Sequence, residues 1–95
     1  MGSLPKPGEI YSLKDQFHHP YRIVVNVKNR LIYYNWLIYD SEKNVVNQTH
    51  ESNVVNSFLF YQIFFKSFSN INEFKTYFNV NVNESVKNLN IEDLF

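Results

Sequence analysis

Three histidines are the side chains best suited to metal binding or acid–base chemistry. His18 and His19 are neighbours, Asp15 lies just before them, and His50 lies much further along the chain. Adjacent side chains of an extended segment point in different directions, so two neighbouring histidines rarely bind one ion. The sequence has no H-x-x-x-H or H-E-x-x-H spacing and no cysteine. The pattern predicts solvated loop histidines, with no metal and no cofactor.

Motifs for nucleophilic catalysis and phosphate binding are also missing from the sequence. It contains no G-x-S-x-G, no phosphate loop and no G-x-G-x-x-G. Two glycines in the whole chain are too few for a glycine-rich phosphate cradle. Acid–base catalysis by paired carboxyl groups needs both held in a cleft, and the adjacent pair Glu92 and Asp93 lies at the end of the sequence. We therefore expect that the protein is not an enzyme.

Tyrosine, asparagine and arginine side chains offer a different chemistry, that of recognition. The strand pairing described below places on one sheet face Arg22, Asn26, Tyr33, Asn35 and Tyr39, together with Val24 and Leu37. Tyrosine and arginine combine contact area with directional hydrogen bonds and are enriched at protein interfaces. We predict that these five polar and aromatic residues bind a partner protein. Stacking of single-stranded nucleic acid or a nucleotide is the alternative, and coverage of the face by residues 58–78 is a third possibility.

A second candidate for partner binding is the acidic and apolar segment from Asn90 to Phe95. A short amphipathic segment of this kind can dock into a basic or apolar groove of a partner. Alternatively, Leu94 and Phe95 hold this segment against the domain as a final turn.

Two strands are expected to position the aromatic face. Residues 21–28 alternate apolar and polar side chains, which predicts a strand with one buried face, and residues 31–39 are apolar at almost every position. A tight loop at Asn29 and Arg30, with Asn29 left-handed, pairs positions whose numbers sum to 59. This register places Ile23, Val25, Tyr34 and Trp36 together in one core. A four-residue loop from residue 28 to 31 gives the same pairing and is the alternative, because arginine is not ideal in a primed turn.

The other expected elements are shorter. We predict an extended lead-in at residues 1–8, a strand at 9–13, a loop at 14–20, a turn at 40–44, a short strand at 45–46 and a loop at 48–53. Residues 54–68 are ambiguous, since aromatic residues recur at helical spacing but the composition favours a strand; we expect a strand to about residue 60 and then a helical turn. A capping box at Asn70 and Glu73 predicts a helix over 71–78. Residues 79–83 fit an edge strand or linker, and residues 84–89 and 91–95 fit helical turns.

Composition sets the class of protein. The chain has 95 residues, a formal net charge of zero, 44% apolar residues and 18% aromatic residues, which predicts one domain with its own core. Charge neutrality disfavours a general nucleic-acid binder. Asparagine occurs 14 times and alanine is absent, a bias typical of an AT-rich genome, such as those of bacteriophages, their low-GC hosts and some parasites. With no secretion signal and no long apolar run, we expect a cytoplasmic protein that does not interact with membranes.

Parts of the sequence resemble a known class of small proteins. The segments are Pro7–Leu13, Pro20–Val24, Leu31–Tyr34 and Asn70–Phe78. They resemble small phage and bacterial accessory proteins with a β-barrel of the Src-homology type, which open with a P-G-x-x-Y strand, continue with a Y-R-V strand and often end in a short aromatic helix. The resemblance implies a binding module and assigns no functional residues.

The combined expectation is a small α+β domain spanning residues 1–95. Three to five antiparallel strands form a sheet or half-open barrel over residues 9–68, and residues 69–95 supply a C-terminal helix. The expected function is that of a non-enzymatic, phage-encoded factor that docks on a host or defence protein and inhibits or modulates it.

Overall fold

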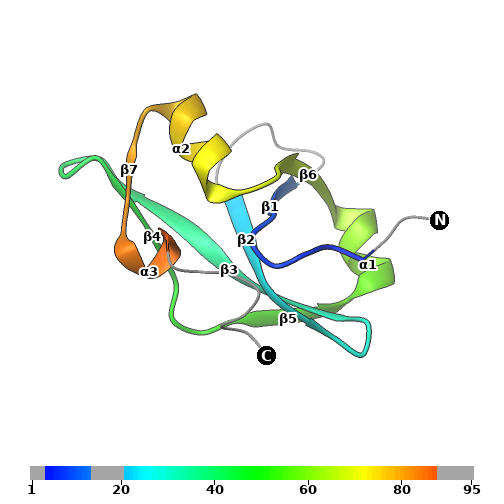
Figure 1. Cartoon of the computed structure of the whole chain (residues 1–95). Coiled ribbons are helices and arrows are strands. Elements are labelled where there is room, and N and C mark those ends of the chain that lie inside the picture. Colours follow the sequence, from blue (N-terminus) through cyan, green and yellow to red (C-terminus); the bar gives the residue numbers. More distant parts are fainter. Residues whose placement is uncertain (1–3, 14–20, 88–95) are drawn as a thin grey trace.

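The computed structural model describes residues 4–13 and 21–87, which form an α+β domain (Figure 1). The sheet is open and has seven strands: β1 (Ile10–Leu13), β2 (Tyr21–Lys28), β3 (Leu31–Asp40), β4 (Val45–Gln48), β5 (Asn53–Asn56), β6 (Phe64–Phe68) and β7 (Asn81–Val82). Three helices accompany it: α1 (Ser57–Ile63), α2 (Ile71–Phe78) and α3 (Glu84–Lys87). The α+β class is confirmed, but the described residues already form more strands than the three to five expected.

The strand order is β6-β1-β2-β3-β4-β7, and β5 also pairs with β3. All pairs are antiparallel except β4 with β7, which is parallel, so the sheet is mixed rather than purely antiparallel. The long strand β3 has two partners on its outer side, because residues 31–34 pair with β5 and residues 37–40 pair with β4. β3 is therefore central, as its continuous apolar run predicted.

The hairpin of β2 and β3 contains a register shift at Val25. Near the turn, Val27 pairs with Ile32 as expected, but beyond Val25 the partners change, so that Ile23 faces Asn35 rather than Trp36. A β-bulge of this kind inserts one extra residue and reverses which face the following side chains occupy. The predicted register is thus correct beside the turn and wrong over residues 21–25.

The bulge divides the expected core between two hydrophobic clusters, one on each face of the sheet. The first cluster contains Ile10, Tyr21, Ile23, Val25, Leu37, Val46, Phe74, Val82 and Val86. The second contains Tyr11, Val24, Ile32, Phe60 and Phe64, with Tyr34 packed against it. Helices α2 and α3 cover the first cluster and α1 covers the second. Trp36, expected in the centre of one core, is only half-buried.

The turn between β2 and β3 is a two-residue loop. Lys28 pairs with Leu31, and both central residues have positive φ, 53° for Asn29 and 64° for Arg30. Positive φ at both positions is the geometry of a type I′ turn, which matches the twist of the strands. The tight loop is confirmed and the four-residue alternative is wrong, even though a left-handed conformation is costly for arginine.

The segment from residue 53 to 68 folds differently from the prediction. The strand β5 ends at Asn56, whose side chain caps α1 by accepting a hydrogen bond from the Leu59 amide at 2.8 Å. Residues 64–68, expected to be helical, form the edge strand β6 paired with β1. Helix α1 therefore carries the chain from the outer edge of β3 to the far edge of β1, across one face of the sheet.

The C-terminal elements follow the prediction closely. Asn70 accepts a hydrogen bond from the Glu73 amide at 2.9 Å and caps α2, which spans the predicted residues 71–78. The Glu73 carboxylate accepts from the Ser69 amide at 2.8 Å, one residue earlier than in the usual capping box. The alternation of asparagine and valine forms the short strand β7, and α3 follows at 84–87.

Several expectations lie outside the described residues: the first three residues of the lead-in, the loop at 14–20 with Asp15, His18 and His19, and the segment from Asn90 to Phe95 with its helical turn. Among the residues that are described, no helix combines the length and apolar character needed to cross a membrane.

Glu9 fastens the edge of the sheet. Its carboxylate accepts hydrogen bonds from the Lys6 amide at 2.9 Å and the Tyr11 hydroxyl at 3.1 Å, and forms an ion pair with Lys66 of β6 at 3.0 Å. Burial alone raises the pKa of the carboxyl, but these three donors together outweigh it and hold the pKa of Glu9 below its ordinary value. The ionised form of Glu9 therefore stabilises the fold.

We expect Arg30→Gly to raise the free energy of unfolding by about 0.5–1 kcal/mol, because glycine adopts a left-handed conformation without the steric cost that arginine has there. Thermal unfolding measures the change as a rise of a few degrees in Tm. Lys28→Gly is the matched control and should lower Tm, since Lys28 has strand geometry. A lower Tm for Arg30→Gly would contradict the turn geometry.

We expect Glu9→Gln to destabilise the protein on the order of 0.5–1 kcal/mol at pH 7. A carboxyl with a lowered folded-state pKa stabilises the fold above its unfolded-state pKa, and this contribution disappears as the pH falls through the folded-state value. Urea unfolding at pH 7 and pH 3 should therefore show a difference from wild type that shrinks at pH 3. Glu42→Gln, at the exposed turn after β3, should show no such pattern; an equal loss at both pH values would argue against the network.

Candidate functional site

The five residues predicted to form one recognition face do not share a surface. Arg22 and Asn35 are buried, Asn26 and Tyr33 are half-buried, and Tyr39 is exposed. The register shift at Val25 moves Arg22 to the face that carries Trp36 and leaves Tyr33, Asn35 and Tyr39 on the opposite face. That opposite face is covered in part by α2, since Tyr33 packs against the cluster that contains Phe74, so the possibility of coverage by residues 58–78 is correct for this part of the face. The expectation of a single exposed aromatic face is therefore wrong in its geometry.

Arg22 is buried next to the second cluster, between the rings of Trp36 and Phe64. Its side chain is 4% exposed, and the guanidinium carbon lies 4.3 Å from the centroid of the Trp36 ring and 5.0 Å from that of Phe64. Desolvation lowers the pKa of Arg22, and the weaker influence of Tyr34 opposes this. Stacking on two aromatic faces is how arginine can be accommodated in an apolar setting. Arg22 thus contributes to packing and is not displayed to a partner.

Asn35 is buried and is the centre of a polar network that extends to the surface. Its amide nitrogen donates to the Gln48 carbonyl oxygen at 2.8 Å, and its carbonyl oxygen accepts from the Ser52 hydroxyl at 2.7 Å. Gln48 in turn donates to the backbone oxygen of Ser85 at 3.1 Å. The amide of Asn35 therefore ties together β3, β4, the loop before β5, and α3. These hydrogen bonds explain why Asn35 can be buried, because a polar side chain is tolerated in the interior when its donor and acceptor both have partners.

The remaining predicted residues are distributed along the other face. Asn26 pairs with Tyr33 across the hairpin and accepts a hydrogen bond from the Val27 amide at 2.8 Å. Tyr33 packs against the first cluster. Tyr39 is 42% exposed, and its hydroxyl donates to the Asn44 side chain at 2.8 Å. Of the five, Tyr39 alone has the exposure that a contact residue needs.

A more exposed aromatic surface lies on α1. Phe58 is 74% exposed, and Leu59 and Tyr61 are also exposed, whereas Phe60 is completely buried. The aromatic residues that recur at helical spacing in residues 54–68 include Phe58 and Tyr61, so that pattern alone predicts that both are buried. The inward side of α1 carries Phe60 and Ile63, which together with Phe64 at the start of β6 also recur at helical spacing. This second spacing, preceded by a possible capping residue at Asn56, was the signal in the sequence that could have identified the buried side.

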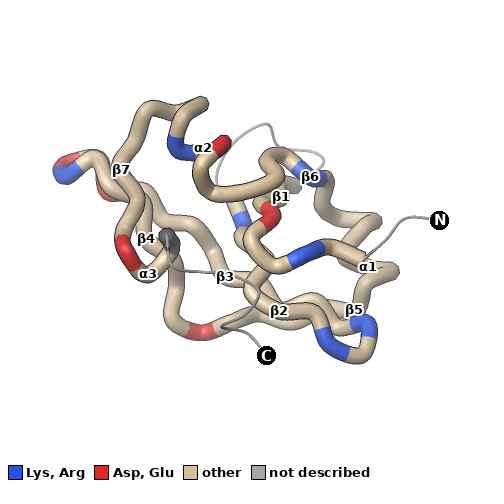
Figure 2. Tube along the Cα trace, viewed as in Figure 1, with Lys and Arg blue, Asp and Glu red and all other residues tan. Residues whose placement is uncertain are grey.

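A basic residue lies directly beside this helix. The Ser57 amide donates to the backbone oxygen of Arg30 at 2.9 Å, which joins the start of α1 to the β2–β3 turn. Arg30 and Lys28 are exposed, and among the described residues neither forms an ion pair with a carboxylate. Figure 2 shows two basic segments at this turn beside β5, whereas acidic segments around β4 and α3 and a mixed acidic and basic turn between β3 and β4 lie at the other end of the molecule. We define the α1 surface as Phe58, Leu59 and Tyr61 together with Arg30.

Phe60 holds the α1 surface in place. Its ring centroid lies 4.7 Å from that of Tyr11 and 4.9 Å from that of Phe64, so α1 is fixed to β1 and β6.

In the described part of the chain, no group of three or more histidine, aspartate and glutamate side chains is placed to hold a metal ion, and His50 lies exposed in the loop before β5. Phe58, Leu59 and Arg30 offer apolar and cationic contact at this end of the molecule, and the charge of Glu9 acts on Tyr61.

We expect Phe60→Ala and Phe58→Ala to differ sharply in stability. Removing the buried ring of Phe60 should cost about 3–5 kcal/mol of unfolding free energy, since it leaves a cavity between α1 and the sheet. Removing the exposed ring of Phe58, two residues away in the same helix, should change stability by less than about 0.5 kcal/mol. Urea unfolding measures both. Similar losses in the two variants would show that Phe58 is packed rather than displayed.

Comparison of the chain with protein-family models, curated proteins and solved structures gives no match. The resemblance to barrel proteins of the Src-homology type consequently stays a prediction. No functional residue comes to this chain from a relative.

Proposed function

We propose that this protein is a non-enzymatic binding module that docks on a partner protein through the α1 surface. The observation that carries the proposal is the exposure of Phe58, 74% of whose surface is open to solvent on a helix that is otherwise anchored. Phe58, Leu59 and Tyr61 are exposed together on this one short helix, and a group of exposed apolar side chains marks an interaction site where a single one does not. Aromatic residues and arginine are also the residue types that dominate binding energy at protein interfaces.

The helix is prepared for binding before a partner arrives. The Asn56 cap fixes the start of α1, and the buried ring of Phe60 fixes the rotation of the helix about its axis. Because the exposed side chains sit on a structured element, little backbone entropy is lost when the partner docks. The α1 surface therefore suits a partner with a complementary, preformed pocket.

The charges at this end indicate the chemistry of the partner. Arg30 and Lys28 lie beside α1 with no described carboxylate paired to them, so a partner with acidic groups around an apolar pocket fits best. Such charges steer association and select among partners more than they add affinity. The amino-acid bias typical of an AT-rich genome supports a phage origin. We propose that the partner is a host or defence protein whose activity is blocked or altered by the contact.

Single-stranded nucleic acid is the second candidate, favoured by one observation: an arginine and a lysine adjoin exposed aromatic rings, the combination on which bases stack. The chain as a whole is electrically neutral, which weighs against it. The salt dependence of binding distinguishes the two candidates. When a protein binds phosphate groups, the logarithm of its binding constant falls steeply and linearly with the logarithm of the salt concentration.

The test begins with capture of partner proteins from bacterial lysate on the immobilised wild-type protein. A partner of the proposed kind should be lost with Phe58→Ala and retained with Phe65→Ala, which removes an equally apolar, exposed ring from β6. With the purified partner, Phe58→Ala should weaken Kd about 30-fold, as expected for an interface anchor worth roughly 2 kcal/mol. Arg30→Gly should lower the association rate and its dependence on salt.

Two outcomes would contradict this function. A partner that is captured equally by wild type and Phe58→Ala binds elsewhere on the molecule. Tight binding of a fluorescent oligothymidylate, lost in Phe58→Ala and weakening steeply between 50 and about 200 mM salt, would instead establish the nucleic-acid function.

A further inference from the structure

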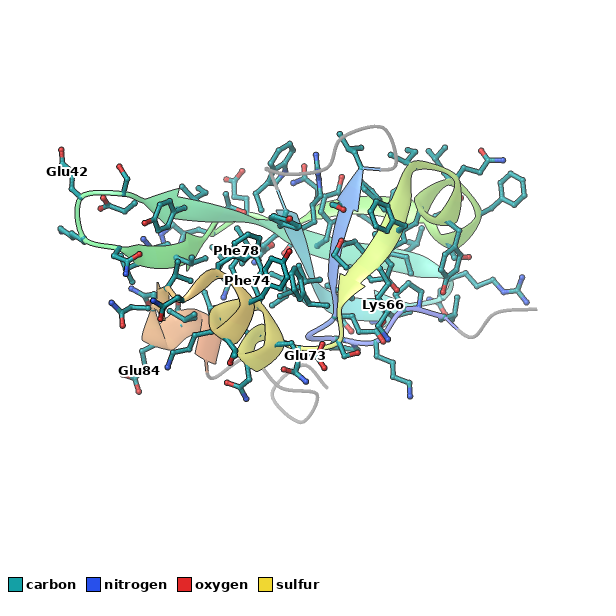
Figure 3. The ribbon with its side chains drawn as sticks, turned by 90° about the horizontal axis from the view of Figure 1, so that it is seen from above. Glu42, Lys66, Glu73, Phe74, Phe78 and Glu84 are labelled. Carbon is teal, nitrogen blue, oxygen red and sulfur yellow. The ribbon has the colours of Figure 1, made fainter. Side chains whose placement is uncertain are left out.

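A small apolar pocket opens between α2 and the β3–β4 hairpin. It has a volume of about 170 Å³ and is lined by Tyr39, Val46, Phe74, Phe78 and Val80. Figure 3 shows Phe74 and Phe78 pointing from α2 toward the sheet. In Figure 1 this part of the molecule lies well away from α1, so the pocket is separate from the α1 surface.

The walls of the pocket are held by the fold. Phe74 and Val46 belong to the first cluster and are almost completely buried. Tyr39 is fixed at the rim by the hydrogen bond from its hydroxyl to Asn44. After α2, the Asn81 amide donates to the Asn44 backbone oxygen at 3.0 Å, which fastens the segment that carries Val80 to the same turn. The pocket is therefore built by the packing of α2 and β7 on the hairpin rather than by one movable loop.

The lining selects neutral aromatic groups. None of the five residues is charged, so an ionised ligand would lose its hydration without gaining a counter-charge. Three of the five are aromatic, and the rings of Phe74 and Phe78 lie 4.8 Å apart at 55°. Aromatic rings at such distances and angles present both edges and faces, and a further ring can join them with edge-to-face or offset contacts.

The pocket is half open to solvent, so its volume limits the part of a ligand that it covers to about one ring. An apolar cavity of about 150 Å³ holds a benzene molecule, whereas sites for larger organic ligands occupy roughly 300–1,000 Å³. We propose that this pocket binds a single neutral aromatic ring of benzene to phenol size, either as a free small molecule or as the side chain of a peptide.

The probes are toluene and phenol, added to the full chain while methyl and aromatic NMR signals are recorded. Signals of Val46, Val80, Phe74 and Phe78 should shift and saturate with a Kd on the order of 1 mM. The signals of Leu59 on α1 should not move. Benzoate and benzylammonium, which have the same ring with a charge, should bind at least about tenfold more weakly.

Two variants and one control test the position of the site. Val80→Phe fills the pocket and should weaken toluene binding at least tenfold. Tyr39→Ala removes one wall of the pocket and should weaken toluene binding severalfold, and because Tyr39 is exposed this substitution should not strain the fold. Val54→Phe places the same new ring on the exposed face of β5 and should leave binding unchanged. Because Tyr39 is exposed, its variant keeps the test decisive if Val80→Phe fails to fold.

The inference is overturned if toluene shifts none of the pocket signals, if the charged analogues bind as well as toluene, or if Val80→Phe and Tyr39→Ala both bind like wild type. N-acetylphenylalaninamide distinguishes the two sources of the ring. Competition with toluene for the same signals shows that the pocket accepts a peptide side chain, and binding of toluene without such competition restricts the pocket to free small molecules.

Discussion

The β-bulge at Val25 decides which face of the sheet each residue of β2 before it occupies. Five consecutive residues of β2, from Tyr21 to Val25, are buried, which a strand with one solvated face does not permit. By inserting an extra residue into the hairpin, the bulge directs Tyr21 and Ile23 toward α2 and directs Arg22 and Val24 toward α1. The positions of all three helices depend on this division, since each helix covers one of the two clusters.

The same division decides which parts of the molecule are available to a ligand or partner. Helix α1 uses its inner side to cover the second cluster, so its outer side displays Phe58 beside Arg30. Helix α2 closes the first cluster incompletely against β3 and β4, and the space that remains is the pocket beside Tyr39. The two proposed sites are therefore consequences of how two short helices are fitted over a sheet that is wider than either of them.

Residues with strong local signals were predictable. The asparagine at position 70 is followed three residues later by glutamate, and α2 begins where that capping pattern places it. The alternation in residues 21–28 and the apolar run after Arg30 predicted the central hairpin, and the tight turn was one of the two loops that they allowed. The segment around Phe58 was mispredicted because its aromatic residues satisfy both helical and strand patterns, and only the pairing of residues 64–68 with β1 separates α1 from β6.

The sequence by itself determined the elements whose stability is local: the β2–β3 hairpin with its left-handed Asn29, the capped helix α2, and the α+β class of the domain. Only the tertiary structure decided the register beyond Val25, the burial of Arg22 and Asn35, and the exposure of Phe58. The physical reason is that the alternation of apolar and polar side chains specifies which face of a strand is buried only when the other face is exposed to solvent. When helices from distant parts of the chain cover both faces, a bulge becomes compatible with the pattern, and long-range packing selects the register.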